Sequence, residues 1–304
     1  MTAPPAARIS GPSFSEFDPA ASLGRGRTVI EASAGTGKTF TISALVARLV
    51  ALEGVPLDEI LVVTFTNAAT AELRDRVRRR LVATHAALTG VPPPDPDEHL
   101  AVILAADPAT KQQAAARLHG ALSTFDRAQI FTIHGFAARL LGHLGLRARL
   151  SPDLEPAEID ELLLAQTAGD LIVGRYAHPA AGGRVGEPMK AHQVIAIGRA
   201  VSATPDAEIV PAPAAVDGEA LARVELAHAL RTEMARRMRR AGLVSFDDGL
   251  MEVSATLADP AVGAAARTML ARRYTVALVD ESQDTDPIQW QVIRAVFDES
   301  RLVV

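Results

Sequence analysis

The chain has 304 residues, of which 48% are hydrophobic and 22% are charged, so it can bury a sizeable core and is too apolar to be disordered as a whole. It contains no cysteine, which excludes disulfides, thiolate metal sites and a cysteine nucleophile. Residues 1–10 lack the basic start and apolar core of a secretory signal. No uncharged apolar run approaches the ~18 residues of a membrane-spanning helix, so we expect a cytoplasmic protein without a membrane partner.

The net charge of −5 argues weakly against a nucleic-acid partner, because such domains often carry a basic excess. Among the 31 basic residues, all but Lys38, Lys111 and Lys190 are arginines, which fits a GC-rich coding bias. Arginines cluster at 74–80 and at 236–240. Such clusters are usually solvated helix faces, and contacts to phosphates or to a partner subunit are the alternative.

The first half of the chain alternates short apolar runs with helical patterns. Continuous apolar and β-branched runs predict strands at 28–32, 60–65 and 129–133. Apolar residues at helical spacing predict helices at 38–52, from Asn67 as the N-cap through Leu81, at 101–122, and from 135 onward. The proline-rich segment 91–97 is predicted to be a loop.

The second half begins with helical pieces between 153 and 240, which are interrupted at 181–188 and 202–218. Ser245 and Asp248 predict a capping box for a helix that ends near residue 257. The next predicted elements are a strand at 275–279, a helix that begins with Asp286 and Pro287, and a strand at 301–304.

Strand, turn and helix recur in order, which predicts an α/β fold with a parallel sheet flanked by helices. Functional loops are then expected at the carboxyl ends of the strands. We divide the chain into an α/β domain at 13–150 and 241–304 and a mostly helical insertion at 151–240. Because the chain stops in a predicted strand, we expect it to be a fragment of a longer protein.

The segment after the first predicted strand nearly matches the phosphate-loop pattern G-x-x-x-x-G-K-[ST], and consists of Ala32, Ser33, Ala34, Gly35, Thr36, Gly37, Lys38 and Thr39. Its glycines let backbone N–H groups face a phosphate, and the following helix adds its positive dipole end. Lys38 supplies charge for the β- and γ-phosphates, and Thr39 supplies a hydroxyl for Mg²⁺. A turn with a chance lysine is the alternative, but it leaves the strand–loop–helix frame unexplained.

Two adjacent carboxylates, Asp280 and Glu281, follow the strand predicted at 275–279. In a phosphate-loop protein, Asp280 would hold Mg²⁺ and Glu281 would orient and deprotonate the attacking water. Gln283 would sense the γ-phosphate. A merely polar loop is the alternative when this segment is taken alone, and helix capping is enough to explain Asp286.

Five segments in this order resemble the successive motifs of UvrD-like superfamily 1 DNA helicases: EASAGTGKT (31–39), VVTFTNAATAELRDRV (62–77), FTIHGFAARLL (131–141), LVSFDDGL (243–250) and VDESQDTDPIQW (279–290). Within this family, the sequences of these motifs are most similar to those of the RecB-type subunits of exodeoxyribonuclease V. The two motif-bearing ends would form the first motor domain, 1A, with a P-loop NTPase (RecA-like) fold. By position, the insertion resembles the 1B subdomain.

The resemblance implies a 3′→5′ translocase driven by ATP hydrolysis with Mg²⁺, acting on single-stranded DNA and duplex ends in double-strand-break resection and recombinational repair. It implies RecC-like and RecD-like partner subunits. The residues that match the family's DNA-contact motifs are Thr64, Phe65, Thr66, Asn67, His134, Gly135 and Phe136. From the residues alone, a core role is also open for the two phenylalanines and the histidine.

The sequence departs from the family pattern at several points. Ser282 stands where the family has an aromatic residue, and we assign it no role. No clear glutamine motif for adenine precedes the phosphate loop, where Phe17 and Asp18 lie in the corresponding region. The motifs of the second motor domain, the arginine finger and the nuclease do not occur. We therefore expect the chain by itself to bind nucleotide weakly and not to unwind DNA.

Two other functions are considered. A P-loop kinase or other phosphotransferase would need an acceptor pocket and a lid, for which no motif is present. A non-catalytic scaffold that binds DNA or partner subunits would need neither. Stimulation of nucleotide hydrolysis by single-stranded DNA separates the helicase from both alternatives.

Overall fold

A five-stranded, all-parallel sheet forms the centre of the main body in the computed structural model, which describes residues 17–21, 26–31, 37–148, 150, 154–176, 189–204, 207–297 and 301–303. The strands are β1 (Gly26–Thr28), β2 (Ile60–Thr64), β3 (Gln129–Thr132), β6 (Val276–Val279) and β7 (Arg301–Val303). They pair in the order β1-β7-β6-β2-β3, so their carboxyl ends meet at one edge.

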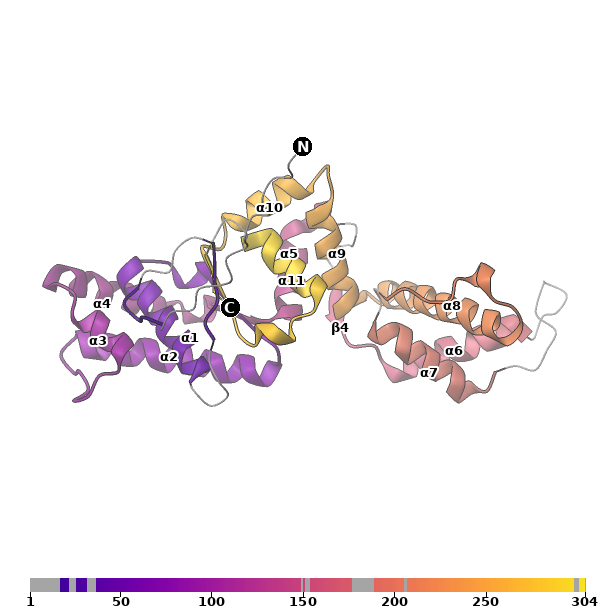
Figure 1. Cartoon of the computed structure of the whole chain (residues 1–304), viewed down its shortest axis with the longest axis horizontal. Coiled ribbons are helices and arrows are strands. Elements are labelled where there is room, and N and C mark those ends of the chain that lie inside the picture. Colours follow the sequence, from indigo (N-terminus) through magenta and orange to yellow (C-terminus); the bar gives the residue numbers. More distant parts are fainter. Residues whose placement is uncertain are drawn as a thin grey trace, which may run out of the picture.

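Helices cover both faces of this sheet (Figure 1). One face carries α1 (Lys38–Arg48), α2 (Asn67–Leu88), α3 (Glu98–Leu104) and α4 (Pro108–Ser123). The other carries α5 (Ile133–Leu144), α9 (Phe246–Ala258), α10 (Gly263–Ala271) and α11 (Pro287–Phe297). The sheet and these eight helices are called the sheet body below.

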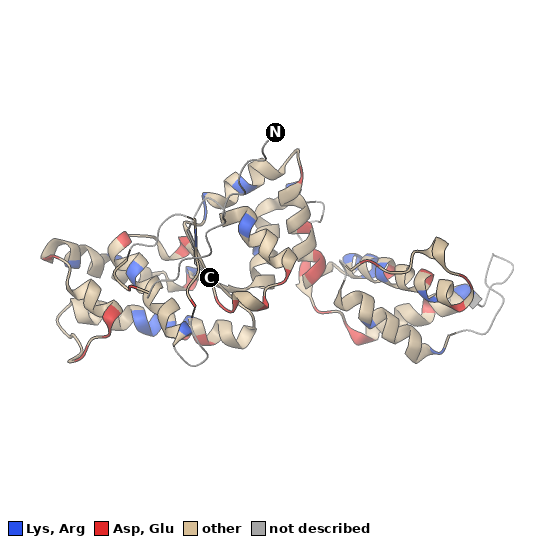
Figure 2. Cartoon of the chain, viewed as in Figure 1, with Lys and Arg blue, Asp and Glu red and all other residues tan. Residues whose placement is uncertain are grey.

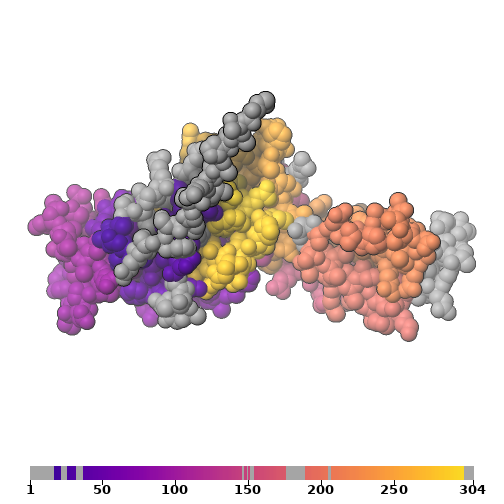
Figure 3. Space-filling view, in the orientation of Figure 1, coloured from indigo at the N-terminus to yellow at the C-terminus, as the bar shows by residue number. Residues whose placement is uncertain are grey.

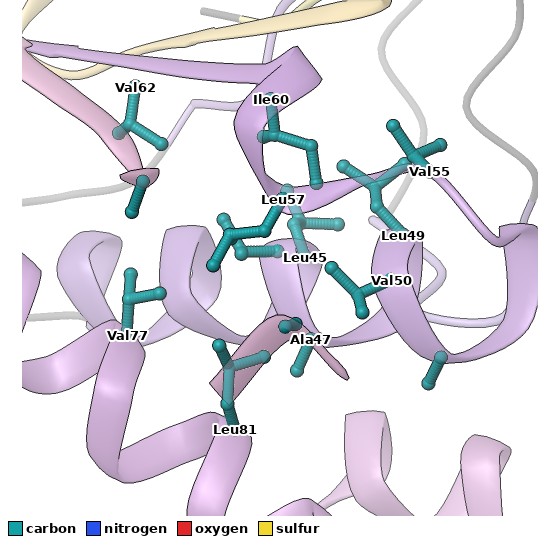
Figure 4. Close-up of a cluster of buried hydrophobic side chains, with 14 of the residues drawn as sticks. Leu45, Ala47, Leu49, Val50, Val55, Leu57, Ile60, Val62, Val77 and Leu81 are labelled. Atoms are coloured by element: carbon teal, nitrogen blue, oxygen red, sulfur yellow. The ribbon is translucent and has the colours of Figure 1, made fainter. Parts of the chain in front are cut away.

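Strand β2 explains why both faces are covered. Side chains alternate along a strand, so Ile60 and Val62 pack against α1 and α2 while Leu61 and Val63 pack against α5 and its neighbours. Figure 4 shows the first of these clusters, with Leu45 of α1 beside the strand residues. Each such side chain stabilises the fold by about 1.5–3 kcal/mol, which accounts for an uninterrupted apolar strand.

Three further helices form a separate helical lobe: α6 (Glu161–Tyr176), α7 (Ala191–Ala203) and α8 (Gly218–Arg240). They pack around Ala168, Val194, Leu226 and Leu230. The two-stranded parallel sheet of β4 (Glu155–Ala157) and β5 (Leu243–Ser245) lies where the lobe joins the sheet body. Figures 1 and 3 show the lobe set to one side of the body and joined to it by a narrow connection.

The predicted α/β pattern of parallel strands with flanking helices is confirmed, and most predicted elements occur within a few residues of their expected bounds. Asp286 caps α11 as predicted, because its carboxylate accepts from the Gln289 N–H at 2.8 Å. The Ser245 hydroxyl likewise accepts from the Asp248 N–H at 3.0 Å. Within the described residues, no helix has the length and apolar character needed to cross a membrane.

Three predictions of local structure are wrong. The first strand covers Gly26–Thr28 instead of 28–32, and Val29 is 59% exposed because the chain there already lines a pocket. The N-cap of α2 is Thr66, whose hydroxyl accepts from the Ala69 N–H, and Asn67 is the first helical residue. The helix predicted at 101–122 is two helices, because Asp107 caps a new helix at Pro108.

Candidate functional site

The predicted site residues come from loops that leave the sheet at its carboxyl edge. Residues 29–31 follow β1, 65–67 follow β2, 133–135 begin α5 after β3, and 280–283 follow β6. Because β6 lies between β7 and β2, the loop after β6 stands in the middle of this edge. The sheet therefore brings together residues that are more than 200 positions apart in the chain, such as Lys38 and Glu281 (|i−j| = 243).

A pocket of about 650 Å³ occupies one part of this edge. Its walls are residues 29–31, one face of α1 and residues 278–283. The α1 residues are Lys38, Thr41, Ile42 and Leu45, which share a face at helical spacing. The predicted catalytic residues Lys38, Glu281 and Gln283 and the predicted metal ligand Asp280 all line this pocket, whereas Thr39 does not.

An ion pair joins the two sides of the pocket. The Lys38 Nζ lies 3.2 Å from the Glu281 Oε2, and the Gln283 amide donates to the same oxygen. The hydrogen bonds from Gln283 and Lys38 lower the pKa of the Glu281 carboxyl. Both side chains of the ion pair are partly exposed (32% and 40%), so incoming charged groups can compete for them.

Asp280 has a different environment from its neighbour. Burial, followed by the nearby Glu281 charge, raises the pKa of the Asp280 carboxyl. Its backbone N–H donates to the Val63 carbonyl at 2.9 Å and so extends the pairing of β6 with β2 by one residue. Its carboxylate accepts from the Glu281 N–H at 3.0 Å. The side chain is therefore held at the strand end, where a bound cation would stabilise the charged form.

The backbone of Glu281 is in the left-handed region, with φ 50° and ψ 42°. It is the one non-glycine residue with positive φ in the described part of the chain. This conformation costs a non-glycine residue roughly 1–2 kcal/mol. Such strain is typical of functional turns, and here it brings the Glu281 carboxylate back towards Lys38.

The N-terminus of α1 fits an anion. Gly37 is its N-cap with φ 94°, a conformation that favours glycine, and no side chain of the described residues caps the helix. The first N–H groups of a helix have no partner within the helix, so they remain available to a ligand. Residues Ala32, Ser33, Ala34, Gly35 and Thr36 of the predicted phosphate loop lie outside the described residues.

The loop after β2 places its predicted DNA-contact residues in two settings. Phe65 is 53% exposed, and Thr66 and Asn67 are exposed beside it. Thr64 is only 2% exposed, and its hydroxyl lies 2.5 Å from the Thr70 hydroxyl. Thr64 is therefore buried beneath the loop and linked to α2 through Thr70.

The predicted DNA-contact residues after β3 also differ in their exposure. Phe136 is fully buried and packs its ring against Tyr274 at 5.6 Å, so of the two roles left open by the sequence the structure places it in the core. Gly135 donates its N–H to the Thr132 hydroxyl at 3.1 Å and lies in the first turn of α5. His134 is partly exposed, with its Nε2 3.3 Å from an Asp247 carboxylate oxygen and its ring 5.7 Å from that of Phe246.

The structure adds residues to which the sequence gave no role. Asp247 and Phe246 belong to the LVSFDDGL segment and meet His134, so that segment reaches the same edge of the sheet. Thr70 holds Thr64 and also donates to the Thr66 carbonyl at 2.9 Å. The motif that contains Thr70 was the available signal, although its spacing alone does not reveal the contact.

Most members of the two arginine clusters are neutralised within the chain. Arg76 and Arg79 pair with acidic residues one turn earlier in α2, and Arg80 forms a two-pronged pair with Asp97. In α8, Arg236 and Arg237 both bond to Glu233. Blue and red segments accordingly lie close together on the helical lobe in Figure 2. Arg239 and Arg240 are exposed and form no ion pair with any described residue.

The chain belongs to the UvrD/REP helicase family: the model of the UvrD/REP helicase N-terminal domain matches residues 15–304. The family match identifies a helicase domain. The individual proteins similar to the chain include RecB subunits of several bacteria. The chain is 35% identical over 280 residues to the RecBCD enzyme subunit RecB of Mycobacterium tuberculosis (strain H37Rv), a match that covers 91% of this chain and 25% of the relative.

Similar matches occur in other bacteria. The RecB subunit of Mycolicibacterium smegmatis is 35% identical over 277 residues, which are 89% of this chain and 24% of that protein. The RecB subunit of Escherichia coli (strain K12) is 39% identical over 154 residues, which are 48% of this chain and 13% of that protein. The chain thus spans about a quarter of the length of the mycobacterial relatives.

Proposed function

We propose that this chain is the ATP-binding motor domain of a RecB-like DNA helicase that translocates 3′→5′ and acts in double-strand-break resection and recombinational repair. The observation that carries the proposal is the pocket in which Lys38 meets Glu281 at 3.2 Å, with Asp280 and Gln283 beside them. An ammonium, two carboxylates and an uncapped helix N-terminus are the groups that a magnesium–nucleotide complex needs.

The roles of the pocket residues follow from their positions, and the role of Thr39 follows from the phosphate-loop pattern. Lys38 would leave Glu281 and bind the β- and γ-phosphates, and the freed Glu281 carboxylate would orient and deprotonate the attacking water. Asp280 and Thr39 would hold Mg²⁺, which neutralises phosphate charge when bound. Gln283 bonds to Glu281 and would follow the presence of the γ-phosphate. The phosphate-loop residues 32–36 would surround the phosphates with backbone N–H groups.

A DNA strand would lie over the remaining part of the same edge. Phe65 offers an exposed ring on which a base can stack, and Thr66, Asn67, His134 and Gly135 supply polar groups beside it. Thr64 and Phe136 would act indirectly, by holding the two loops. We infer further that residues 13–150 and 241–304 form the first motor domain, 151–240 its 1B-like insertion, and that RecC-like and RecD-like subunits complete the complex.

The test is DNA-stimulated ATP hydrolysis by the full-length protein. Lys38→Ala and Glu281→Gln should each abolish turnover, because one removes the phosphate-binding charge and the other removes the base. Lys111→Ala in α4 and Glu98→Gln in α3 are matched controls, since both make the same changes outside the pocket. Wild-type turnover in either pocket variant would contradict the assignment.

The same assay separates the alternatives. A phosphotransferase would hydrolyse ATP at a rate independent of single-stranded DNA, and a scaffold would not hydrolyse it at all. Phe65→Ala should weaken binding of single-stranded DNA and the stimulation of hydrolysis, while basal hydrolysis is retained. Base stacking on an aromatic ring is worth ~1–3 kcal/mol, so affinity should fall at least about fivefold.

A further inference from the structure

The first turns of α5 and α9 meet beside the predicted DNA-contact residues that follow β3. Helix α5 is capped by Thr132, whose hydroxyl accepts from the Gly135 N–H, and α9 is capped in the same way by Ser245. The two helices share one buried cluster and lie side by side in Figure 1. The side chains that leave these two first turns are therefore held in a fixed relation to each other.

His134, in the first turn of α5, has one buried and one accessible ring nitrogen. The side chain as a whole is 32% exposed. Its Nε2 is nevertheless buried and has no aligned hydrogen bond with any described residue, whereas Nδ1 is not among the buried unpaired atoms. A ligand that approaches this side chain therefore meets Nδ1, and Nε2 is left to interact with the protein.

Asp247, in the first turn of α9, supplies the acceptor that faces the buried nitrogen. One of its carboxylate oxygens lies 3.3 Å from the His134 Nε2, and this carboxylate forms no other ion pair or hydrogen bond with a described residue. Arg199 lines the same cavity as Asp247 but forms a two-pronged pair with Glu161. The positive end of α9 also favours a carboxylate at this position.

This arrangement determines where the imidazole carries its hydrogen. A lone pair on Nε2 would be repelled by the Asp247 oxygen at 3.3 Å, so Nε2 carries a hydrogen whether the ring is neutral or charged. In the neutral ring, Nδ1 is then the acceptor. The Phe246 ring lies 5.7 Å from the imidazole, centre to centre, and packing against it opposes rotation of the histidine.

We propose that Asp247 is a positioning residue that acts on DNA through His134. Its carboxylate holds the Nε2 hydrogen and so presents Nδ1 to a single strand on the carboxyl edge of the sheet. This inference rests on the proposed function, because it takes His134 as a contact to DNA. Asp247 itself need not touch the strand, and its charge taken alone would repel the phosphates.

The sign of the effect on DNA binding separates positioning from plain charge repulsion. Removal of a carboxylate near a bound strand strengthens binding if only repulsion matters, whereas removal of a positioning residue weakens it. Asp247→Asn keeps the shape of the side chain and removes its charge. In the full-length protein, it should weaken binding of a fluorescent oligothymidylate about threefold to tenfold, as expected for the loss of one hydrogen bond.

His134→Ala provides the background that shows whether Asp247 acts through the histidine. In that variant, the added Asp247→Asn change should alter the affinity by less than about twofold, because the group to be positioned is absent. Asp248→Asn is the matched control: it removes the same charge from the next residue of α9 and should not weaken binding. The proposal is overturned if Asp247→Asn does not weaken binding, if the loss persists without His134, or if Asp248→Asn causes an equal loss.

A spectroscopic measurement tests the same link without DNA. In protein labelled with ¹⁵N in its histidine rings, the His134 signals are assigned by their loss in His134→Ala, and they should report a hydrogen on Nε2. Asp247→Asn should add a population with the hydrogen on Nδ1, because an amide can donate to Nε2 as well as accept from it. Asp248→Asn should add no such population.

Two outcomes of this measurement would contradict the proposal: a wild-type His134 with its hydrogen on Nδ1 alone, and His134 signals that Asp247→Asn leaves unchanged. Failure of the proposed function has a different signature, because the wild type would then bind no single-stranded DNA. In that case the nitrogen signals alone support or overturn the link between Asp247 and His134.

Discussion

At the scale of single residues, Thr64 shows that a side chain in a predicted contact motif can be buried and support its loop. It is the last residue of β2 and lies beneath the exposed Phe65–Asn67 segment. Its hydroxyl can be satisfied only locally, and the Thr70 hydroxyl at 2.5 Å does so. Thr70 in turn donates to the Thr66 carbonyl, so one hydroxyl connects strand, loop and helix.

Replacing Thr70 with valine should therefore loosen the loop. The change keeps the shape of the side chain but leaves the buried Thr64 hydroxyl without its closest partner, which costs about 1–3 kcal/mol. Urea unfolding should show this loss of stability. Affinity for single-stranded DNA should fall as well, because Phe65 is no longer held in one position.

Thr232→Val is the control for this change. The Thr232 hydroxyl also donates to the carbonyl four residues earlier, but within the exposed face of α8 and with no second threonine. Its loss should cost about 0.5 kcal/mol or less and leave DNA affinity unchanged. Equal effects of the two variants would show that the Thr64–Thr70 contact is irrelevant to the loop.

At the scale of elements, α3 is tied to its neighbours by a partly buried charge cluster. Its N-cap, Asp97, accepts two hydrogen bonds from Arg80 of α2. The hydrogen bond from Arg80 lowers the pKa of Asp97. His99, two residues on, is only 6% exposed and lies near the rings of Phe17 and Phe40. Burial and then the charge of Arg80 lower the pKa of His99.

The lowered pKa of His99 predicts a pH-dependent stability. In the unfolded chain histidine takes up its proton near pH 6.5, whereas the folded protein resists protonation until lower pH. The unfolded state therefore binds more protons below pH 6.5, and the free energy of unfolding falls there as the pH drops. The contribution is complete above pH 6.5, and its slope is at most about 1.4 kcal/mol per pH unit.

Urea unfolding of wild type and His99→Leu between pH 7.5 and about 5 measures this contribution. The variant should lose part of the slope, while the contribution of His143 remains in both proteins and cancels in the comparison. The same slope in wild type and variant would refute the role of His99.

The elements also show how far the sequence could predict this structure. Continuous apolar runs identified β2 and β6, because both faces of those strands are buried. Strand β1 was misplaced: Val29, Ile30 and Glu31 look like strand residues but line the pocket. The prediction of one helix at 101–122 missed the new helix start at Asp107 and Pro108.

For the candidate site, the sequence identified Lys38, Asp280, Glu281 and Gln283, which line one pocket as their positions at strand ends require. The sequence could not predict which motif residues face inward. Phe65 and Phe136 are both aromatic residues near a strand end, yet one is 53% exposed and the other is buried. That difference depends on tertiary packing against Tyr274 and Phe297, which lie far along the chain.

At the scale of the whole molecule, the sheet body and the helical lobe have very different cores. Each face of the sheet buries a large cluster that includes alternate residues of β2 and β6. The described core of the lobe consists of Ala168, Val194, Leu226 and Leu230, with partly buried residues around it. Because this core is small, ion pairs contribute a larger share of the stability of the lobe. Arg237 of α8 bonds to Glu233 in the same helix and to Asp170 of α6.

We expect the lobe to unfold before the body, and acid to weaken it further. The hydrogen bonds from Arg236 and Arg237 lower the pKa of Glu233 to about 2. Its stabilising contribution is therefore complete above about pH 4.5 and is lost as the pH falls towards 2. Since these pairs lie near the surface, Glu233→Gln should destabilise the lobe at neutral pH by about 1 kcal/mol.

The single tryptophan makes the two transitions separable, because Trp290 lies in α11 and reports on the body alone. In urea, the far-UV circular dichroism signal of the lobe helices should disappear in an early phase. Trp290 fluorescence should not change in that phase. At pH 3 that phase should move to lower urea in the wild type and move less in Glu233→Gln, because the variant has no carboxylate to protonate. Glu219→Gln breaks only an exposed pair with Arg223 in the same helix and should behave like the wild type. One transition seen equally by both probes would mean that lobe and body unfold as a unit, and that the acid-sensitive pairs of α8 stabilise the whole chain.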